Sequence, residues 1–205
     1  MHMWSRRTLL GLALAIPAAF LGSRGTRRLF AAQLPASFGQ GEKPCDPNEK
    51  LTPAVPAGPE FKAQSPARAS LREAGMAGTP LVIAGQVSGI RCGAVKGAVL
   101  DFWQADATGK YDATGFKLRG RVTSDAHGHY QLDTIIPGAA GTHAKCIHVR
   151  ITPPKGAALT TALFFPGGPG DARNEKEPGF QKALVLTLAD AAVGKKSTFD
   201  FVLDL

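Results

Sequence analysis

Three residues near the middle of the chain carry side chains that bind transition metals. Cys146 and His148 are separated by one residue, and His143 precedes them. Residues two apart in a β-strand point to the same face. A strand here would therefore present the Cys146 sulfur and the His148 imidazole on one face, with about 7 Å of strand between the two residues. Thiolate and imidazole ligands favour copper or zinc. A Cys-x-His pair at this spacing is compatible with a metal site; the alternative is that these side chains pack without a metal.

Strands must position these residues, because the second half of the chain consists of short runs rich in β-branched and aromatic residues. Gly, Pro, Asp and Asn fill the gaps, which is typical of antiparallel sandwiches and barrels. The runs that we expect to form strands are 81–87, 98–104, 116–123, 130–136, 147–152, 159–165, 183–188 and 198–203. The sequence therefore predicts an all-β fold, an antiparallel β-sandwich over residues 80–205, with little helix.

Two further segments precede this domain. Residues 33–79 are rich in Pro, Ala and Gly, which exclude a helix or a central strand and predict an extended arm over the domain. Residues 1–32 resemble an export signal: Arg6 and Arg7 directly precede the apolar run 9–22, which is shorter than the about 20 residues of a membrane-spanning helix.

The arginine pair predicts export by the twin-arginine translocase, to the periplasm or the outside of the cell. An ordinary secretory signal is the alternative. We expect no stable membrane span in the mature chain unless the signal is retained as an anchor. The twin-arginine route carries folded proteins, often with a cofactor already bound, which agrees with a metal site.

The charge of the chain gives little support to nucleic-acid binding. The formal net charge is +8, but residues 1–32 contain five arginines and no acid, which leaves 19 basic and 16 acidic residues in the remainder. No basic stripe with interleaved aromatic residues follows, so we expect no nucleic-acid partner. GxGxxG, GxxxxGK[ST], HExxH and GxSxG motifs are also missing from the sequence, which removes the common nucleotide, zinc-protease and serine-hydrolase interpretations.

Several segments resemble the intradiol ring-cleavage dioxygenases. Phe102–Tyr111, Leu118–Tyr130 and Thr134–Gly138 are similar to the central block of that family, Leu159–Pro166 to its LTTQ-x-[YF]-F segment, and Thr52–Phe61 to a diverged form of its arm motif. The resemblance extends from about Leu51 to Leu205. It implies a β-sandwich that holds one non-haem ferric ion between two tyrosines and two histidines, and that cleaves catechols between the hydroxylated carbons with O2.

The resemblance also implies which residues hold the metal. The first tyrosine ligand falls on Tyr111. The family pattern P-G-x-Y, followed by an arginine and by H-x-H, can be laid on residues 137–148 without a gap. The second tyrosine then falls on Ala140, the arginine on His143, the first histidine on Cys146 and the second on His148. Two of the four family ligands are kept, and the implied site is Tyr111, His143, Cys146 and His148.

The substitutions bear on the chemistry. In the family the second tyrosinate is thought to leave the iron and take a catechol proton, which Ala140 cannot do. His143 replaces the family arginine only when it is protonated. A thiolate at Cys146 favours copper or zinc and is readily oxidised. Arg119 and Arg121 share a strand face, and the resemblance implies that this segment approaches the metal. We take Arg121 as the second catalytic candidate; a solvated salt bridge is the alternative role of this pair.

Cys45 and Cys92 complete the cysteine count. An odd number of cysteines in an exported protein leaves one over, and Cys146 occupies the ligand position. A disulfide between Cys45 and Cys92 would stabilise the domain by about 4 kcal/mol in the chain-entropy model. The alternative is two free thiols.

Two functions from different classes stay open. The first is an exported intradiol-type dioxygenase, an oxidoreductase that uses O2 and a bound iron on a small aromatic diol. The second is a non-oxygenase copper or zinc protein on the same fold. We place the first ahead, because Tyr111, His148 and the surrounding segments are kept.

Overall fold

The computed structural model describes residues 48–58, 61–91, 93–167 and 173–205, which belong to one compact unit. The expected export signal, most of the first half of the arm, Cys45 and Cys92 lie outside the described residues, so the disulfide stays a prediction. Within the described ranges, no helix is long and apolar enough to cross a membrane.

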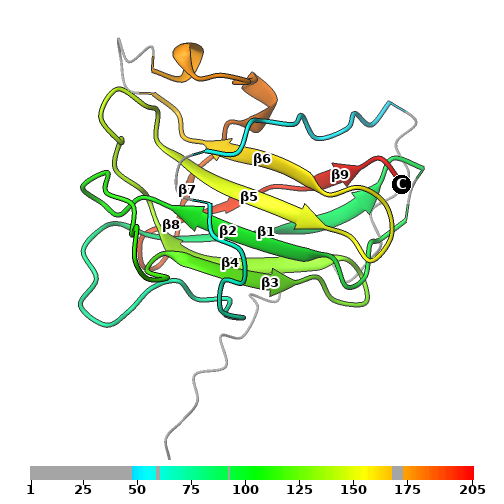
Figure 1. Cartoon of the computed structure of the whole chain (residues 1–205), viewed down its shortest axis with the longest axis horizontal. Coiled ribbons are helices and arrows are strands. Elements are labelled where there is room, and N and C mark those ends of the chain that lie inside the picture. Colours follow the sequence, from blue (N-terminus) through cyan, green and yellow to red (C-terminus); the bar gives the residue numbers. More distant parts are fainter. Residues whose placement is uncertain (1–47, 59–60, 92, 168–172) are drawn as a thin grey trace, which may run out of the picture. The chain divides into compact units, whose positions relative to one another are not determined.

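Two stacked sheets form the domain (Figure 1). The first has the order β3 (Arg119–Thr123), β2 (Val99–Gln104), β5 (Cys146–Thr152) and β6 (Leu159–Phe164), with every pair antiparallel. The second has the order β4 (His129–Ile135), β1 (Pro80–Gly89), β8 (Lys195–Thr198) and β7 (Ala189–Asp190), and β9 (Phe201–Leu203) also pairs with β1. The fold confirms the predicted β-sandwich, with one refinement: β1 runs parallel to β8 and β9.

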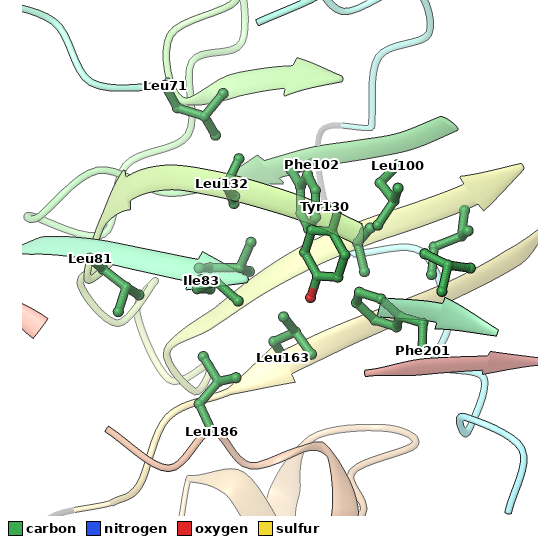
Figure 2. Packing of buried hydrophobic residues seen from close by; sticks show 14 of the residues in the cluster. Leu71, Leu81, Ile83, Leu100, Phe102, Tyr130, Leu132, Leu163, Leu186 and Phe201 are labelled. Carbon is green, nitrogen blue, oxygen red and sulfur yellow. The ribbon is translucent and has the colours of Figure 1, made fainter. Parts of the chain in front are cut away.

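The core lies between the two sheets and follows from the alternation along the strands. On β5, Ile147, Val149 and Ile151 point inward and are fully buried. Figure 2 shows Phe102 and Tyr130 meeting at the centre of this layer. The Tyr130 hydroxyl donates to the Phe199 carbonyl, so Tyr130 is a core residue, as its position in a strand predicts.

The outer face of the β3-β2-β5-β6 sheet is covered by the arm. The Val55 amide donates to the Thr160 carbonyl at the β6 edge. Farther along, the Arg121 amide donates to the Pro66 carbonyl, so the arm also pairs with the β3 edge. Figure 1 shows the arm beside β6 and again across β2. The arm therefore leaves neither edge of this sheet open.

Two of the expected strands differ from the structure. Residues 183–188 do not form a strand: a short 3-10 turn, η2 (Lys182–Leu184), is followed by a single bridge between Val185 and Phe164. The last expected strand, 198–203, overlaps the end of β8 and includes β9, and between them the Phe199 carbonyl lies against Gly85 of β1. The other helical element among the described residues is η1 (Asn174–Lys176), also a 3-10 turn.

Candidate metal and substrate site

A tight turn after β2 positions Tyr111. The Asp106 carboxylate accepts hydrogen bonds from the Thr108 hydroxyl and from the amides of Thr108 and Lys110, which closes the turn. Burial raises the Asp106 pKa, but these hydrogen bonds outweigh it and lower the pKa below its usual value. Gly109, at a φ of 86°, lies against the Ala139 carbonyl, and a Cβ there would be 2.0 Å from that oxygen. Two loops that are distant in sequence can therefore approach backbone to backbone, the Tyr111 loop and the loop that contains Ala140.

Strand β5 presents Cys146 and His148 to the outer face of its sheet, as the spacing predicts. The Tyr111 hydroxyl lies 3.1 Å from Nε2 of His148, and the Cys146 sulfur lies 3.4 Å from the same nitrogen. Metal–nitrogen bonds of 2.0–2.1 Å and a metal–sulfur bond of about 2.3 Å would separate N and S of one tetrahedral ion by about 3.5 Å. The oxygen, sulfur and nitrogen thus converge on one point.

Burial sets the protonation of this cluster. Burial raises the pKa of Cys146 to about 12, with the nearby Glu177 carboxylate as the next cause. Burial also raises the pKa of Tyr111 well above its usual value of 10. It lowers the pKa of His148 to about 4, and the positive charge of Arg119 acts in the same direction. All three groups are therefore neutral near pH 7 in the absence of a metal.

Packing on both sides of the His148 ring adds to the contacts at its Nε2 atom. The Trp103 indole stacks on the imidazole, with centroids 5.1 Å apart and planes 19° from parallel. A Cβ on Gly58 of the arm would lie 1.9 Å from Cε1 of His148, so the arm backbone presses on the ring. No described residue gives the buried Nδ1 atom a hydrogen-bond partner. Sequence reasoning missed Gly58, although it lies in the segment that resembles the family's arm motif.

A cavity of about 200 Å³ opens onto the cluster. Its walls include Ala140 and Ala162, which stand where the family pattern has a tyrosine and the glutamine of LTTQ. Phe164 of β6 and the arm residues 55–58 complete much of the lining. The small side chains leave an apolar space. Its volume is below the about 300–1,000 Å³ of sites for drug-sized ligands, so it suits a ligand with a single ring.

His143 lines the same cavity but lies apart from the three-donor cluster. Its Nδ1 is 3.2 Å from a carboxylate oxygen of Glu177, and 62% of its side chain is exposed. Over the described ranges, no group of three or more His, Cys, Asp or Glu side chains could hold a metal ion, so a third donor beside Cys146 and His148 has to come from Tyr111. Sequence reasoning missed Glu177, for which no motif gave a signal.

The two arginines of β3 differ in their surroundings. Arg121 is exposed, pairs across the sheet with Asp101, and is not part of the cavity wall. Arg119 is 1% exposed, lies opposite Trp103, and donates to the Asp112 carbonyl close to Tyr111. Two residues of strand, about 6.6 Å, separate them. The structure thus brings Arg119, rather than the expected Arg121, close to the cluster.

The donors present do not fit the ferric centre that the fold family implies. That centre needs two phenolates and two imidazoles, and the structure brings together one phenol, one imidazole and a thiol. Ferric iron favours hard anionic oxygen, whereas a thiolate with imidazole suits copper or zinc. The cluster therefore offers three donors that could hold one transition-metal ion.

Comparison with known proteins places this geometry in a family. A family model described as Dioxygenase matches residues 57–205. The chain is similar to catechol 1,2-dioxygenase 1 of Acinetobacter lwoffii, with 39% identity over 115 residues, covering 44% of this chain and 37% of that protein. It is also similar to the protocatechuate 3,4-dioxygenase beta chain of Burkholderia cepacia, with 33% identity over 110 residues, covering 45% and 47%. The matches span less than half of either relative.

Solved structures agree. The dioxygenase domain of a dioxygenase carbohydrate-binding protein fusion from Streptomyces sp. SirexAA-E superposes with a TM-score of 0.71 and 42% identity, over 76% of this chain and 99% of that one. The intradiol ring-cleavage dioxygenase from Tetranychus urticae superposes with a TM-score of 0.66 over 76% and 96%, and its 21% identity supports the fold alone.

Proposed function

Because this chain belongs to the intradiol ring-cleavage dioxygenase family, we propose that its cavity binds a catechol-type aromatic diol and that the domain oxidises this diol with O2, by means of one non-haem metal ion that Tyr111, Cys146 and His148 would hold. The observation that carries the proposal is the convergence of Tyr111, Cys146 and His148 at the buried end of a cavity of single-ring size. The names of the two curated relatives state catechol 1,2-dioxygenase activity for one protein and protocatechuate 3,4-dioxygenase activity for the other.

The chain's own residues support binding of such a ligand. The Tyr111 hydroxyl, neutral because burial raises its pKa, is a donor and acceptor for a diol oxygen. Ala140, Ala162 and Phe164 offer apolar contact to an aromatic ring. The diol end of the ligand therefore lies against the cluster, and the rest of the ring lies between the alanine walls.

The second candidate function is a non-oxygenase metal protein that binds copper or zinc through Tyr111, Cys146 and His148. Cys146 favours it, since a buried thiol two residues before a buried imidazole is a soft ligand pair in place of the family's two histidines. Ala140 favours it too, because the family's second tyrosine is replaced by a side chain without a donor atom.

One variant tests whether the two substituted family ligands limit the oxidation of a diol. Ala140→Tyr with Cys146→His recreates the two-tyrosine, two-histidine set, and Ala140→Phe with Cys146→Leu is the control of similar size without those donors. We expect the restored variant, loaded with iron, to gain a tyrosinate-to-iron colour and to consume O2 with catechol at least tenfold faster than the wild type. The control should gain neither property.

The wild type is then tested as purified and after loading with iron, copper and zinc in turn. Catechol-dependent O2 uptake that is lost in His148→Ala supports the oxidoreductase. Bound copper with a thiolate colour that vanishes in Cys146→Ser, without O2 uptake, supports the second function. Protein that binds neither catechol nor metal, yet unfolds normally, overturns both.

We also propose that residues 1–32 direct export by the twin-arginine translocase. The support is the Arg6-Arg7 pair before a short apolar run. Replacing both arginines by lysine should keep the protein in the cytoplasm, as measured by fractionation. Unchanged export would show that another route is used.

A further inference from the structure

Glu177 forms a charged wall of a cavity that is otherwise mostly apolar. It follows η1, and its carboxylate accepts a hydrogen bond of 2.5 Å from the Ala144 amide and lies 3.2 Å from Nδ1 of His143. Its side chain is 15% exposed, against 62% for His143. The carboxylate is therefore held in place by two contacts while it lines the cavity.

The cavity has an electrostatic polarity. At its buried end, Arg119 lies behind Tyr111 and His148, and its positive charge lowers the pKa of both groups. The negative charge of Glu177 has the opposite effect on Tyr111, and it raises the pKa of Cys146 as well. Among the lining residues, Glu177 carries the full negative charge, and His143 can offset it only when protonated.

Exposure shows which end is open. Cys146 and His148 are 8% and 6% exposed, so they lie at the closed end, and the more exposed His143 lies at the opening with Glu177 beside it. A diol bound with its oxygens at the cluster shares this cavity of about 200 Å³ with the Glu177 carboxylate, which is close enough to Cys146 to raise its pKa. A ring substituent that turns toward Glu177 meets a carboxylate.

We propose that Glu177 makes this cavity selective for catechol-type diols with a neutral or cationic ring substituent, and that it rejects diols that carry a carboxylate. This inference rests on the proposed binding of a diol. A ligand carboxylate near Glu177 is repelled at low effective dielectric and loses its hydration, since the alanine walls offer it no donor. An ammonium group at the same position gains an ion pair with a carboxylate that is already oriented.

The test measures binding rather than turnover. Isothermal titration at pH 7.5 and low salt compares catechol, 3,4-dihydroxybenzoate and 2-(3,4-dihydroxyphenyl)ethylamine on the full chain. We expect the wild type to bind catechol and the amine at least about tenfold more tightly than the benzoate. In Glu177→Gln, which keeps the shape of the side chain, the benzoate should bind within about threefold of catechol.

Glu175→Gln is the matched control, because it removes the same charge from an exposed position two residues away that is not part of the cavity wall. It should leave the order of affinities unchanged. Binding of all three ligands with equal affinity, or an unchanged ratio in Glu177→Gln, overturns the selectivity but keeps the diol site. Failure of all three ligands to bind overturns the diol site itself, and the selectivity with it.

Discussion

The two faces of the β3-β2-β5-β6 sheet contain different types of buried residue, although the same strands form both faces. On β5, the inward residues Ile147, Val149 and Ile151 are apolar and fully buried, whereas the outward Cys146 and His148 are polar and almost as buried. The inward face meets another sheet, and the outward face meets the arm. Burial alone therefore does not identify the core of this domain. The element that packs on each face, the second sheet or the arm, determines which residue types that face contains.

The inward face should dominate stability. Phe102 is fully buried on β2 and contacts Tyr130 at a centroid distance of 6.0 Å. Phe102→Ala should lower the free energy of unfolding by about 3–5 kcal/mol, because it leaves a cavity between two sheets. Val99→Ala, on the outward face of the same strand and only partly buried, should cost less than about 1 kcal/mol. Equal losses in urea unfolding would show that the two faces do not differ.

The alternation of side chains along the strands predicts the inward face, and it also predicts part of the site. The period of two placed Cys146 and His148 on one face, and β5 confirms that placement. Residues 183–188 have the composition of a strand but pair with β6 at a single bridge. The sequence does not exclude a strand there, because composition does not show which strand edges are already paired. Arg119 and Arg121 share a face, so alternation could not tell which one lies beside Tyr111.

Features that depend on long-range contacts were not predictable in this way. Glu177 enters the cavity from a turn far along the chain and is held there by the Ala144 amide. His143 lies close to the cluster in sequence but pairs with Glu177, so proximity along the chain did not make it a metal donor. Nothing in the local sequence around either residue indicates this pairing.

The outward face should show its dependence on the arm at Gly58. The φ angle of Gly58 is not in the left-handed region, so alanine is acceptable to the backbone, but its Cβ would overlap the His148 ring. Gly58→Ala should therefore cost about 1–3 kcal/mol in urea unfolding, as other overpacked sites do. In a His148→Ala background the same change should cost at least about 1 kcal/mol less, because the overlapping ring is gone. Equal costs in both backgrounds would show that the arm does not press on the ring.

The smallest effect is expected at Asp101, on the outward face. Replacing Asp101 tests whether the nearby arginines or the burial of this face dominates the energy of its charge. Burial raises the Asp101 pKa above 3.8, although Ser65, Arg121, Arg119 and Arg150 act to lower it. A carboxyl group with a raised pKa in the folded state binds protons more readily there than in the unfolded chain, so its stabilising contribution is present below pH 3.8 and is lost as the pH rises through the folded pKa.

Asp101→Asn keeps the neutral form at every pH. It should therefore be more stable than the wild type at pH 7, by up to about 1 kcal/mol because the position is only partly buried and solvent screens its charge, and the difference should vanish below pH 3.8. Asp190→Asn is the opposite control: the Lys195 hydrogen bond lowers the pKa of this exposed carboxyl, so neutralising it should give no gain at pH 7. A loss of stability in Asp101→Asn at pH 7, measured by urea unfolding across this pH range, would mean that the arginines outweigh burial. Charge pairing, rather than burial under the arm, would then dominate the contribution of these polar residues to stability.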